Sequence, residues 1–174
     1  MIYDVWLQRA LGFGKKKLKQ ALEFYGNSEN IFKADENSLA LSNVFSKMDI
    51  KRITETTLND AKQIIKDCKK RKINIITISD PKYPQCLREI ESPPIVLYYR
   101  GTFPDFDNTP TVAVVGTREI TEYGGKCAYS LGLRLAKAGM IVVSGGARGG
   151  DRNAHLGALC VGGLTVAVLG CGLD

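Results

Sequence analysis

The chain has 174 residues, of which 44% are hydrophobic and 24% are charged, and this composition indicates a folded globular protein rather than a disordered or fibrous one. No apolar run approaches the roughly 20 residues of a membrane helix, and the first residues lack the basic start and apolar core of a secretory signal, so we expect a cytoplasmic protein with no membrane partner. The net charge of +6 lies entirely in residues 1–72, which hold 15 Lys and Arg against 9 Asp and Glu, whereas residues 73–174 hold 9 of each. Such an excess suits either a nucleic-acid partner or a lysine-rich surface that only keeps the protein in solution.

Residues 1–72 show helical periodicity and no strand-like alternation. One apolar stripe recurs at helical spacing from Leu18 to Tyr25, and a second runs from Leu58 to Cys68. The sequence therefore predicts a small all-helical domain over residues 1–72.

A turn rich in glycine and lysine precedes the first of these stripes. Its pattern resembles the SAM-like or helix-hairpin-helix turn, in which glycine amides at a helix start contact a phosphate and lysines reinforce the contact. The alternative is an ordinary corner between helices with solvated lysines. The residues of this possible secondary DNA contact are Gly12, Gly14, Lys15, Lys16 and Lys17.

The period changes at Ile73. Short apolar runs at 73–78 and 95–99 predict strands, with a short helix from Tyr83 to Glu89 between them and a loop over 102–110. From Thr111 onward, three apolar runs alternate with two helical patterns. The runs cover 112–115, 140–143 and 165–169, and the helices cover 127–138 and 152–160.

This alternation predicts a Rossmann-like, doubly wound parallel α/β sheet over residues 73–174. The continuous apolar runs predict strands that are buried on both faces. Because no helix follows the last strand, we expect the sheet to be incomplete at the C-terminus and the chain to be part of a longer protein.

Glycine follows each of the three apolar strands. Ligands of open parallel sheets bind beyond the carboxyl ends of the strands, where glycine lets backbone amides approach an anion. The alternative is that these loops only need tight turns. Neither the Walker A pattern nor the dinucleotide fingerprint is present, so we expect no nucleotide cofactor. The predicted phosphate-binding residues are Gly116, Arg118, Ser144, Gly145, Gly146, Arg148, Gly149 and Asp151.

The chain resembles the DprA/Smf family in several segments: 112–118, 123–124, 144–151, His155, 157–159 and 166–174, with a similar lead-in at 80–84, 93–94 and 97–101. One departure is Gly150, where the family usually has isoleucine, and this predicts a looser loop or looser packing. The resemblance implies an extended Rossmann fold that binds single-stranded DNA. It also implies protection of incoming strands, help in loading RecA recombinase during natural transformation, and a homodimer in the full-length protein.

No carboxylate pair, serine–base pair or cysteine–base pair is arranged for catalysis, so we expect a binding protein without catalytic residues. His155, the only histidine, is expected to be a packing residue. A rival hypothesis is a Rossmann-like nucleoside-monophosphate phosphoribohydrolase, and a third is a pure protein-interaction module.

The five cysteines are widely spaced and odd in number, with no C-x-x-C pattern. They predict buried thiols in a reducing compartment and no metal site. They are Cys68, Cys86, Cys127, Cys160 and Cys171.

Overall fold

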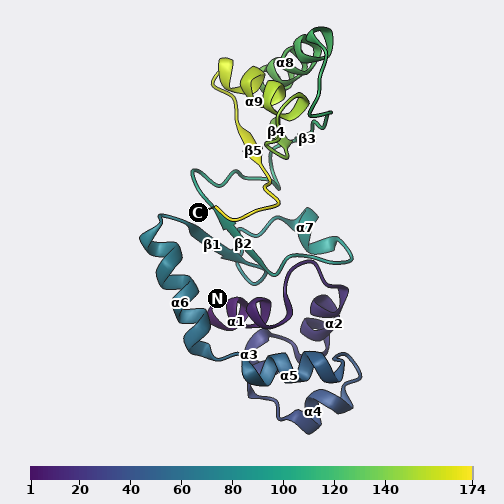
Figure 1. Cartoon of the computed structure of the whole chain (residues 1–174), viewed down its shortest axis with the longest axis vertical. Coiled ribbons are helices and arrows are strands. Elements are labelled where there is room, and N and C mark those ends of the chain that lie inside the picture. Colours follow the sequence, from purple (N-terminus) through teal and green to yellow (C-terminus); the bar gives the residue numbers. More distant parts are fainter. Residues whose placement is uncertain (174) are drawn as a thin grey trace. The chain divides into compact units, whose positions relative to one another are not determined.

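The computed structural model describes residues 1–173, and the chain divides into two compact units between Gly101 and Thr102 (Figure 1). The first unit begins with six helices, which confirms the predicted helical character of this region, although the apolar stripes located only two of them. Their bounds are α1 Ile2–Leu11, α2 Lys16–Tyr25, α3 Ser28–Lys33, α4 Glu36–Leu41, α5 Lys47–Glu55 and α6 Leu58–Lys70.

Helix α1 is the centre of the first unit. Its side chains are buried on nearly every face, and Trp6, Leu7 and Leu11 are almost completely enclosed by the helices around them. Its polar groups also find partners, because the Trp6 Nε1–H donates to the Thr56 carbonyl at 2.7 Å and Asp4 accepts from the Ser28 hydroxyl at 2.7 Å. A helix that is buried all round organises the core on which the other elements pack.

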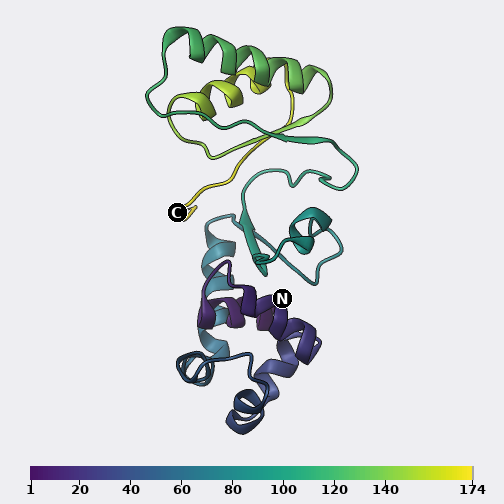
Figure 2. The same ribbon diagram turned by 90° about the vertical axis from the view of Figure 1, so that its right-hand side faces the viewer.

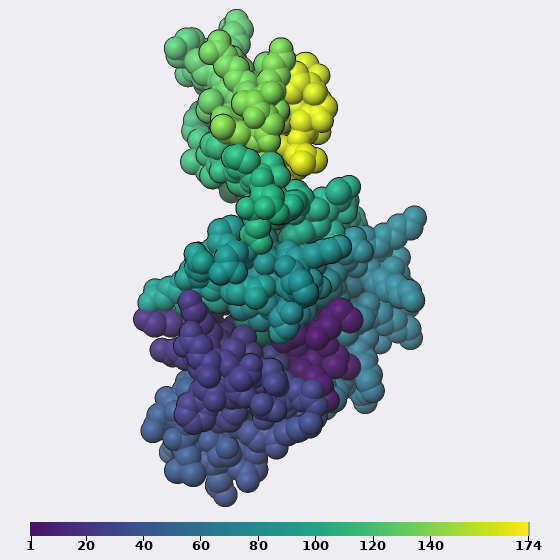
Figure 3. All heavy atoms as spheres, turned by 180° about the vertical axis from the view of Figure 1, so that it is seen from behind, coloured from purple at the N-terminus to yellow at the C-terminus, as the bar shows by residue number. Residues whose placement is uncertain are grey.

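A small hairpin completes the first unit. Strands β1 (Asn74–Thr77) and β2 (Val96–Tyr99) pair antiparallel in the register Asn74↔Tyr99, with α7 (Gln85–Glu89) between them. The Val96 amide donates to the Gln8 side-chain oxygen at 2.9 Å, and Val96 belongs to the same core as α1. Figure 3 shows the teal residues of the hairpin lying against the purple start of the chain.

The position of this hairpin differs from the sequence-based domain boundary. The pattern groups residues 73–101 with the α/β domain, whereas in the structure they belong with the helices. A two-stranded ladder cannot bury its own apolar face, so it needs a neighbouring core, and α1 provides it.

The second unit is a three-stranded parallel sheet with two crossover helices. Its elements are β3 Thr111–Ala113, α8 Glu122–Lys137, β4 Ile141–Ser144, α9 Gly150–Cys160 and β5 Thr165–Ala167. The strand order is β3-β4-β5, with Thr111 opposite Ile141 and Val142 opposite Thr165. This arrangement confirms the predicted Rossmann-like α/β fold.

Both helices of the second unit cover the same face of the sheet (Figure 2). Because the two crossovers advance in one direction and have the same hand, their helices fall on one side. The helices also lie very close together: a Cβ at Gly132 would be 2.1 Å from the Ala154 carbonyl oxygen, and one at Gly157 would be 2.0 Å from that of Tyr129. Glycine is therefore required at both crossing points.

The expected burial on both faces is wrong for the described residues. Val142 is fully buried beneath α8 and α9, but Val115 is 81% exposed and Val168 is 63% exposed. The apolar runs predict strands with helices packed on both faces of the sheet, whereas the described residues place helices on one face only.

The cysteine prediction is also partly wrong. All five thiols are free, but only Cys68 is buried, whereas the other four are exposed. Cys127 and Cys160 are exposed on α8 and α9. The apolar stripe of a helix shows that the helix packs on a core, but it does not show whether each residue of the stripe is covered. Among residues 1–173, no helix is both long and apolar enough to cross a bilayer.

A buried ion pair links α2 to α5. Asp49 accepts from the Ser46 backbone amide at 3.0 Å and from the Ser46 hydroxyl at 2.6 Å, and it pairs with the Lys17 ammonium. Burial alone would raise the pKa of Asp49, but the hydrogen bonds from Lys17 and Ser46 outweigh burial and lower the pKa to about 2. The charged form is thus favoured in the folded chain.

We predict that this carboxylate makes the stability of the first unit depend on acid pH. Because the folded pKa lies below the unfolded one, the stabilisation is complete above about pH 4 and is lost as the pH falls towards 2; it amounts to about 2 kcal/mol. Urea unfolding of Asp49→Asn should show that loss at neutral pH and a weaker pH dependence below pH 4. The exposed Glu36→Gln serves as control, and an unchanged pH profile in Asp49→Asn would contradict the assignment.

Candidate nucleic-acid interface

The loops after β3 and β4 lie at the same edge of the sheet and touch each other. We call residues 116–118 and 145–150 together the strand-end edge. The Gly150 amide donates to the Thr117 carbonyl at 3.1 Å. Gly149 adopts the left-handed φ of +81°, and a Cβ there would lie 2.1 Å from the Thr117 oxygen. The two loops are therefore held together by direct backbone contact.

Gly150 contributes to this contact rather than loosening it. A Cβ on Gly150 would lie 2.7 Å from the Cα of Gly116, closer than real Cβ atoms approach other atoms. The expectation of a looser loop at this departure from the family pattern is therefore wrong for this structure, because the missing side chain is what lets the loops meet.

We predict that Gly150→Ala destabilises the second unit by about 1–3 kcal/mol, the usual cost of overpacking a closely packed site. Gly170→Ala is a matched control, because a Cβ at Gly170 would meet no atom within 4 Å. Thermal unfolding followed by circular dichroism measures both variants. Equal melting temperatures for the two would contradict the close contact.

Asp151 lies beneath the strand-end edge and binds both loops. Its carboxylate accepts the backbone amides of Gly116 at 3.3 Å, Gly145 at 3.2 Å and Ala147 at 3.3 Å. The residue is only 7% exposed. Burial alone would raise the pKa of this carboxyl, but the hydrogen bonds from these amides prevail, and the net effect lowers it.

This geometry changes the roles of several predicted residues. The amides of Gly116 and Gly145, which the sequence suggests as phosphate donors, already donate to Asp151. Asp151 itself faces inward, and the N-cap of α9 is Gly149. Ser144 is also buried, and its hydroxyl donates to the Val114 carbonyl at 2.5 Å. The hydrogen bonds of these residues stay inside the protein and hold the loops of the strand-end edge in place.

Gly146 extends the edge towards the third strand. It has a φ of +70°, and a Cβ there would lie 3.0 Å from the Leu169 side chain and 3.5 Å from that of Ala167. The glycines after β4 thus allow the loop to pass close to both neighbouring strand ends.

Arg118 and Arg148 are the outward-facing members of the predicted set. Each is exposed on one of the two touching loops, and within residues 1–173 no hydrogen bond or ion pair engages either guanidinium. Sequence reasoning missed a third exposed arginine, Arg152, in the first turn of α9. Its amide donates to the Ala147 carbonyl at 3.1 Å, which ties that turn to the loop. The signal in the sequence was its position four residues after Arg148, at the start of the predicted helix.

His155 has a structural role, as its position on a packed helix suggested. Its Nδ1 lies 2.6 Å from the Thr165 hydroxyl oxygen, and that hydroxyl donates to the Val142 carbonyl at 2.8 Å. The Thr165 oxygen therefore accepts from His155, so the proton is on Nδ1. Burial lowers the pKa of His155, which favours this neutral form.

The lysine-rich turn of the first unit is more constrained than the sequence suggested. Gly12 and Gly14 have φ values of +83° and +59°, as a tight turn requires. Lys16 pairs with Glu91 and Lys17 pairs with Asp49. The structure therefore leaves Lys15 as the member of the run that no ion pair within residues 1–173 engages.

The fold and the strand-end edge together define a Rossmann-like α/β protein with exposed arginines on the loops that follow its strands. Residues 74–174 match the family described as DNA recombination-mediator protein A, and the chain belongs to that family. This confirms the DprA/Smf resemblance.

Curated relatives are similar over different parts of the chain. Protein Smf of Synechocystis is 35% identical over 97% of this chain and 44% of its own length. DNA processing protein DprA of Streptococcus pneumoniae is 39% identical over 60% of this chain and 36% of its own length. The chain thus spans less than half the length of these relatives.

A solved structure supports the same relationship. The X-ray structure of DNA processing protein A from Streptococcus pneumoniae has a TM-score of 0.75 and 29% sequence identity to this chain. The match covers all of this chain and 59% of that one.

We predict that Asp151→Asn loosens the strand-end edge. An amide group cannot accept three backbone N–H bonds without directing its own donors at some of them, so we expect a loss of about 1–3 kcal/mol. Because the folded pKa of Asp151 is lowered, its stabilisation is present at neutral pH and disappears as the pH falls below the usual carboxyl range. Amide hydrogen exchange of Gly145 and Ala147 should accelerate. The exposed Glu122→Gln is the control, and unchanged exchange in Asp151→Asn would exclude the role given to Asp151.

Proposed function

We propose that this protein binds single-stranded DNA at the strand-end edge, through the phosphate backbone and with little base preference. In the cytoplasm it would protect incoming strands and help to load RecA recombinase during natural transformation or recombination. We propose a binding protein without catalytic activity, and a homodimer in the full-length form. The family described as DNA recombination-mediator protein A and the relatives named DNA processing protein support this proposal.

The observation that carries the proposal is that Arg118 and Arg148 are both exposed on two loops that contact each other. A guanidinium presents a planar set of donors that matches a phosphodiester, and charge-assisted bonds of this kind are among the stronger ones. The amides of Gly116 and Gly145 already donate to Asp151, so we assign the contact with the phosphates to the guanidiniums. Backbone contacts of this type position a nucleic acid without reading its sequence.

A preference for single strands is supported by an exposed aromatic side chain that follows one of the two loops in the chain. Tyr123, in the first turn of α8, is 78% exposed and follows the loop that carries Arg118. Bases of a single strand can stack on such a ring, whereas the paired bases of a duplex are already stacked on one another.

The test compares Arg148→Ala with Arg134→Ala by fluorescence anisotropy of a labelled oligo-dT. Arg134 is also an exposed arginine, but it lies in the last turn of α8, whereas the strand-end loops are followed by the first turns of α8 and α9. Losing Arg148 should cost about 1.5–3 kcal/mol, which is a tenfold or larger loss of affinity, because a bond to a charged group is removed. The control should change affinity by less than about twofold, as expected for a screened surface charge.

Salt and competitor arms complete this experiment. Affinity for oligo-dT should fall with salt, with a slope of about −0.7 for each neutralised phosphate. A duplex of the same length and a free nucleoside monophosphate should both bind more weakly. Tighter binding of the duplex, a salt-independent affinity, or equal losses in the two arginine variants would count against the proposal.

A further inference from the structure

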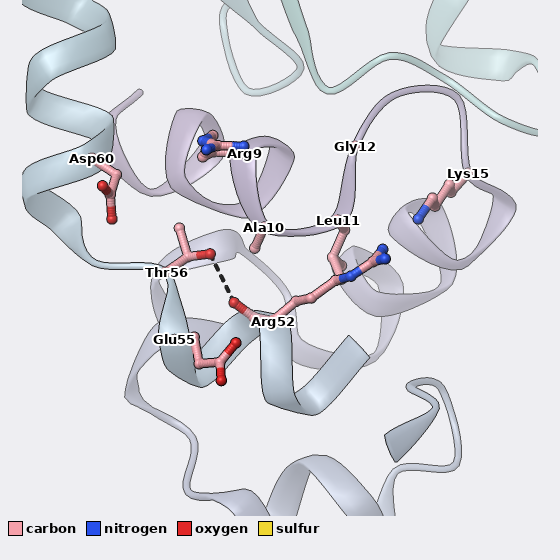
Figure 4. A pocket seen from close by; sticks show the side chains of 9 residues that line it. All are labelled: Arg9, Ala10, Leu11, Gly12, Lys15, Arg52, Glu55, Thr56 and Asp60. Carbon is pink, nitrogen blue, oxygen red and sulfur yellow. Dashed lines mark hydrogen bonds between the residues drawn. The ribbon is translucent and has the colours of Figure 1, made fainter. Parts of the chain in front are cut away.

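The first unit contains a pocket of about 550 Å³ where α1 and α5 end and α6 begins. Three cationic side chains line it, and they come from three different segments: Arg9 from α1, Lys15 from the turn before α2, and Arg52 from α5. Figure 4 shows the Arg52 side chain running from α5 towards Leu11 and the turn that carries Lys15. The three cations thus line one pocket, although Arg52 is far from Arg9 and Lys15 in sequence.

The two carboxylates of the pocket already have partners. Asp60 accepts the backbone amide of Thr57 at 2.7 Å and its hydroxyl at 2.8 Å, as the capping box of α6. Glu55 pairs with Lys51 at 3.7 Å, one turn back along α5. By contrast, within residues 1–173 no hydrogen bond or ion pair holds the side chains of Arg9, Lys15 and Arg52. Arg9 also attracts the Asp60 carboxylate electrostatically, but the lining carries three cations against two carboxylates, so the pocket is positive overall.

An exposed aromatic side chain stands in the same turn as Lys15. Phe13 is 66% exposed, and in the chain it lies between Gly12 and Lys15, which line the pocket, although its own ring is not part of the lining. Gly12 and Gly14 on either side of it have left-handed φ values, as a tight turn requires. Cations near an exposed aromatic side chain are the combination with which proteins bind single strands, because the cations hold the phosphates and the ring stacks on a base.

We propose that this pocket, which we call the cationic pocket, is a second binding site for single-stranded nucleic acid. Arg9, Lys15 and Arg52 hold the phosphodiester backbone, and Phe13 stacks on one base. The cationic pocket shares no residue with the strand-end edge, so the proposal stands apart from the proposed function. It also assigns the nucleic-acid contact of the first unit to the pocket rather than to Lys16 and Lys17, which are engaged in ion pairs.

The test uses the whole chain and two variants with the same change of charge. Arg9→Ala with Arg52→Ala removes two cations of the pocket, whereas Lys62→Ala with Lys66→Ala removes two exposed cations from α6. Binding of fluorescein-labelled oligo-dT should weaken on the order of tenfold in the first variant and less than about twofold in the second. Phe13→Ala should weaken oligo-dT binding on the order of fivefold or more through lost stacking. It should leave the binding of inorganic phosphate unchanged.

Backbone amide shifts in an NMR titration of the unmodified chain with oligo-dT locate the contact. Shifts at Gly12, Lys15 and Thr56 support the cationic pocket, and their absence overturns it, whatever happens at Gly145 and Arg148. If shifts occur only at Gly12, Lys15 and Thr56, the cationic pocket stands and the proposed function of the strand-end edge fails. Equal losses in the two double variants overturn the cationic pocket. Should the arginine variant fail to fold by circular dichroism, Phe13→Ala and the titration decide the question.

Discussion

The strand-end edge of the second unit depends on the hydrogen bonds that the buried carboxylate of Asp151 accepts. This carboxylate accepts amides from Gly116, Gly145 and Ala147, and these residues lie on loops that follow two different strands. A buried carboxylate is tolerated only where hydrogen bonds replace its hydration, and three amides do so here. The carboxylate thereby fixes the positions of both loops, and with them the places from which Arg118 and Arg148 emerge.

This arrangement changes what the glycines do. In many open α/β sheets, glycine amides at the strand ends face a bound phosphate. Here the Asp151 carboxylate accepts the Gly116 and Gly145 amides, and glycine also permits close approach between backbones, as between Gly116 and Gly150. Under the proposed function, phosphate recognition would pass from fixed backbone amides to flexible guanidiniums. Flexible side chains are better suited to a nucleic-acid strand, which can bind at many positions along its length, than to a single small nucleotide.

The elements of the fold were largely predictable, but their partners were not. Apolar runs and helical stripes located β4, α8 and α9 to within a few residues, because periodicity is a local property. The pairing of the β1–β2 hairpin with α1 depends on contacts such as the one between Val96 and Gln8, 88 residues apart, which no local pattern contains. For the same reason the residue types of the strand-end edge were found, but not the inward orientation of Asp151 and Ser144. The ion pairs of Lys16 and Lys17 were missed because their partners are remote.

The excess of positive charge in the N-terminal part has two separable consequences. Pairing Lys17 with Asp49 leaves the net charge of the first unit unchanged, so its long-range attraction for a polyanion persists. Short-range binding is different, because the Asp49 carboxylate neutralises the Lys17 ammonium and holds it in place. Within residues 1–173 no carboxylate forms such an ion pair with Arg9 or Arg52, and neither stands in the lysine-rich turn that draws attention in the sequence. The count of charges therefore predicts attraction to nucleic acid, whereas the pattern of internal ion pairs selects the side chains that can bind it.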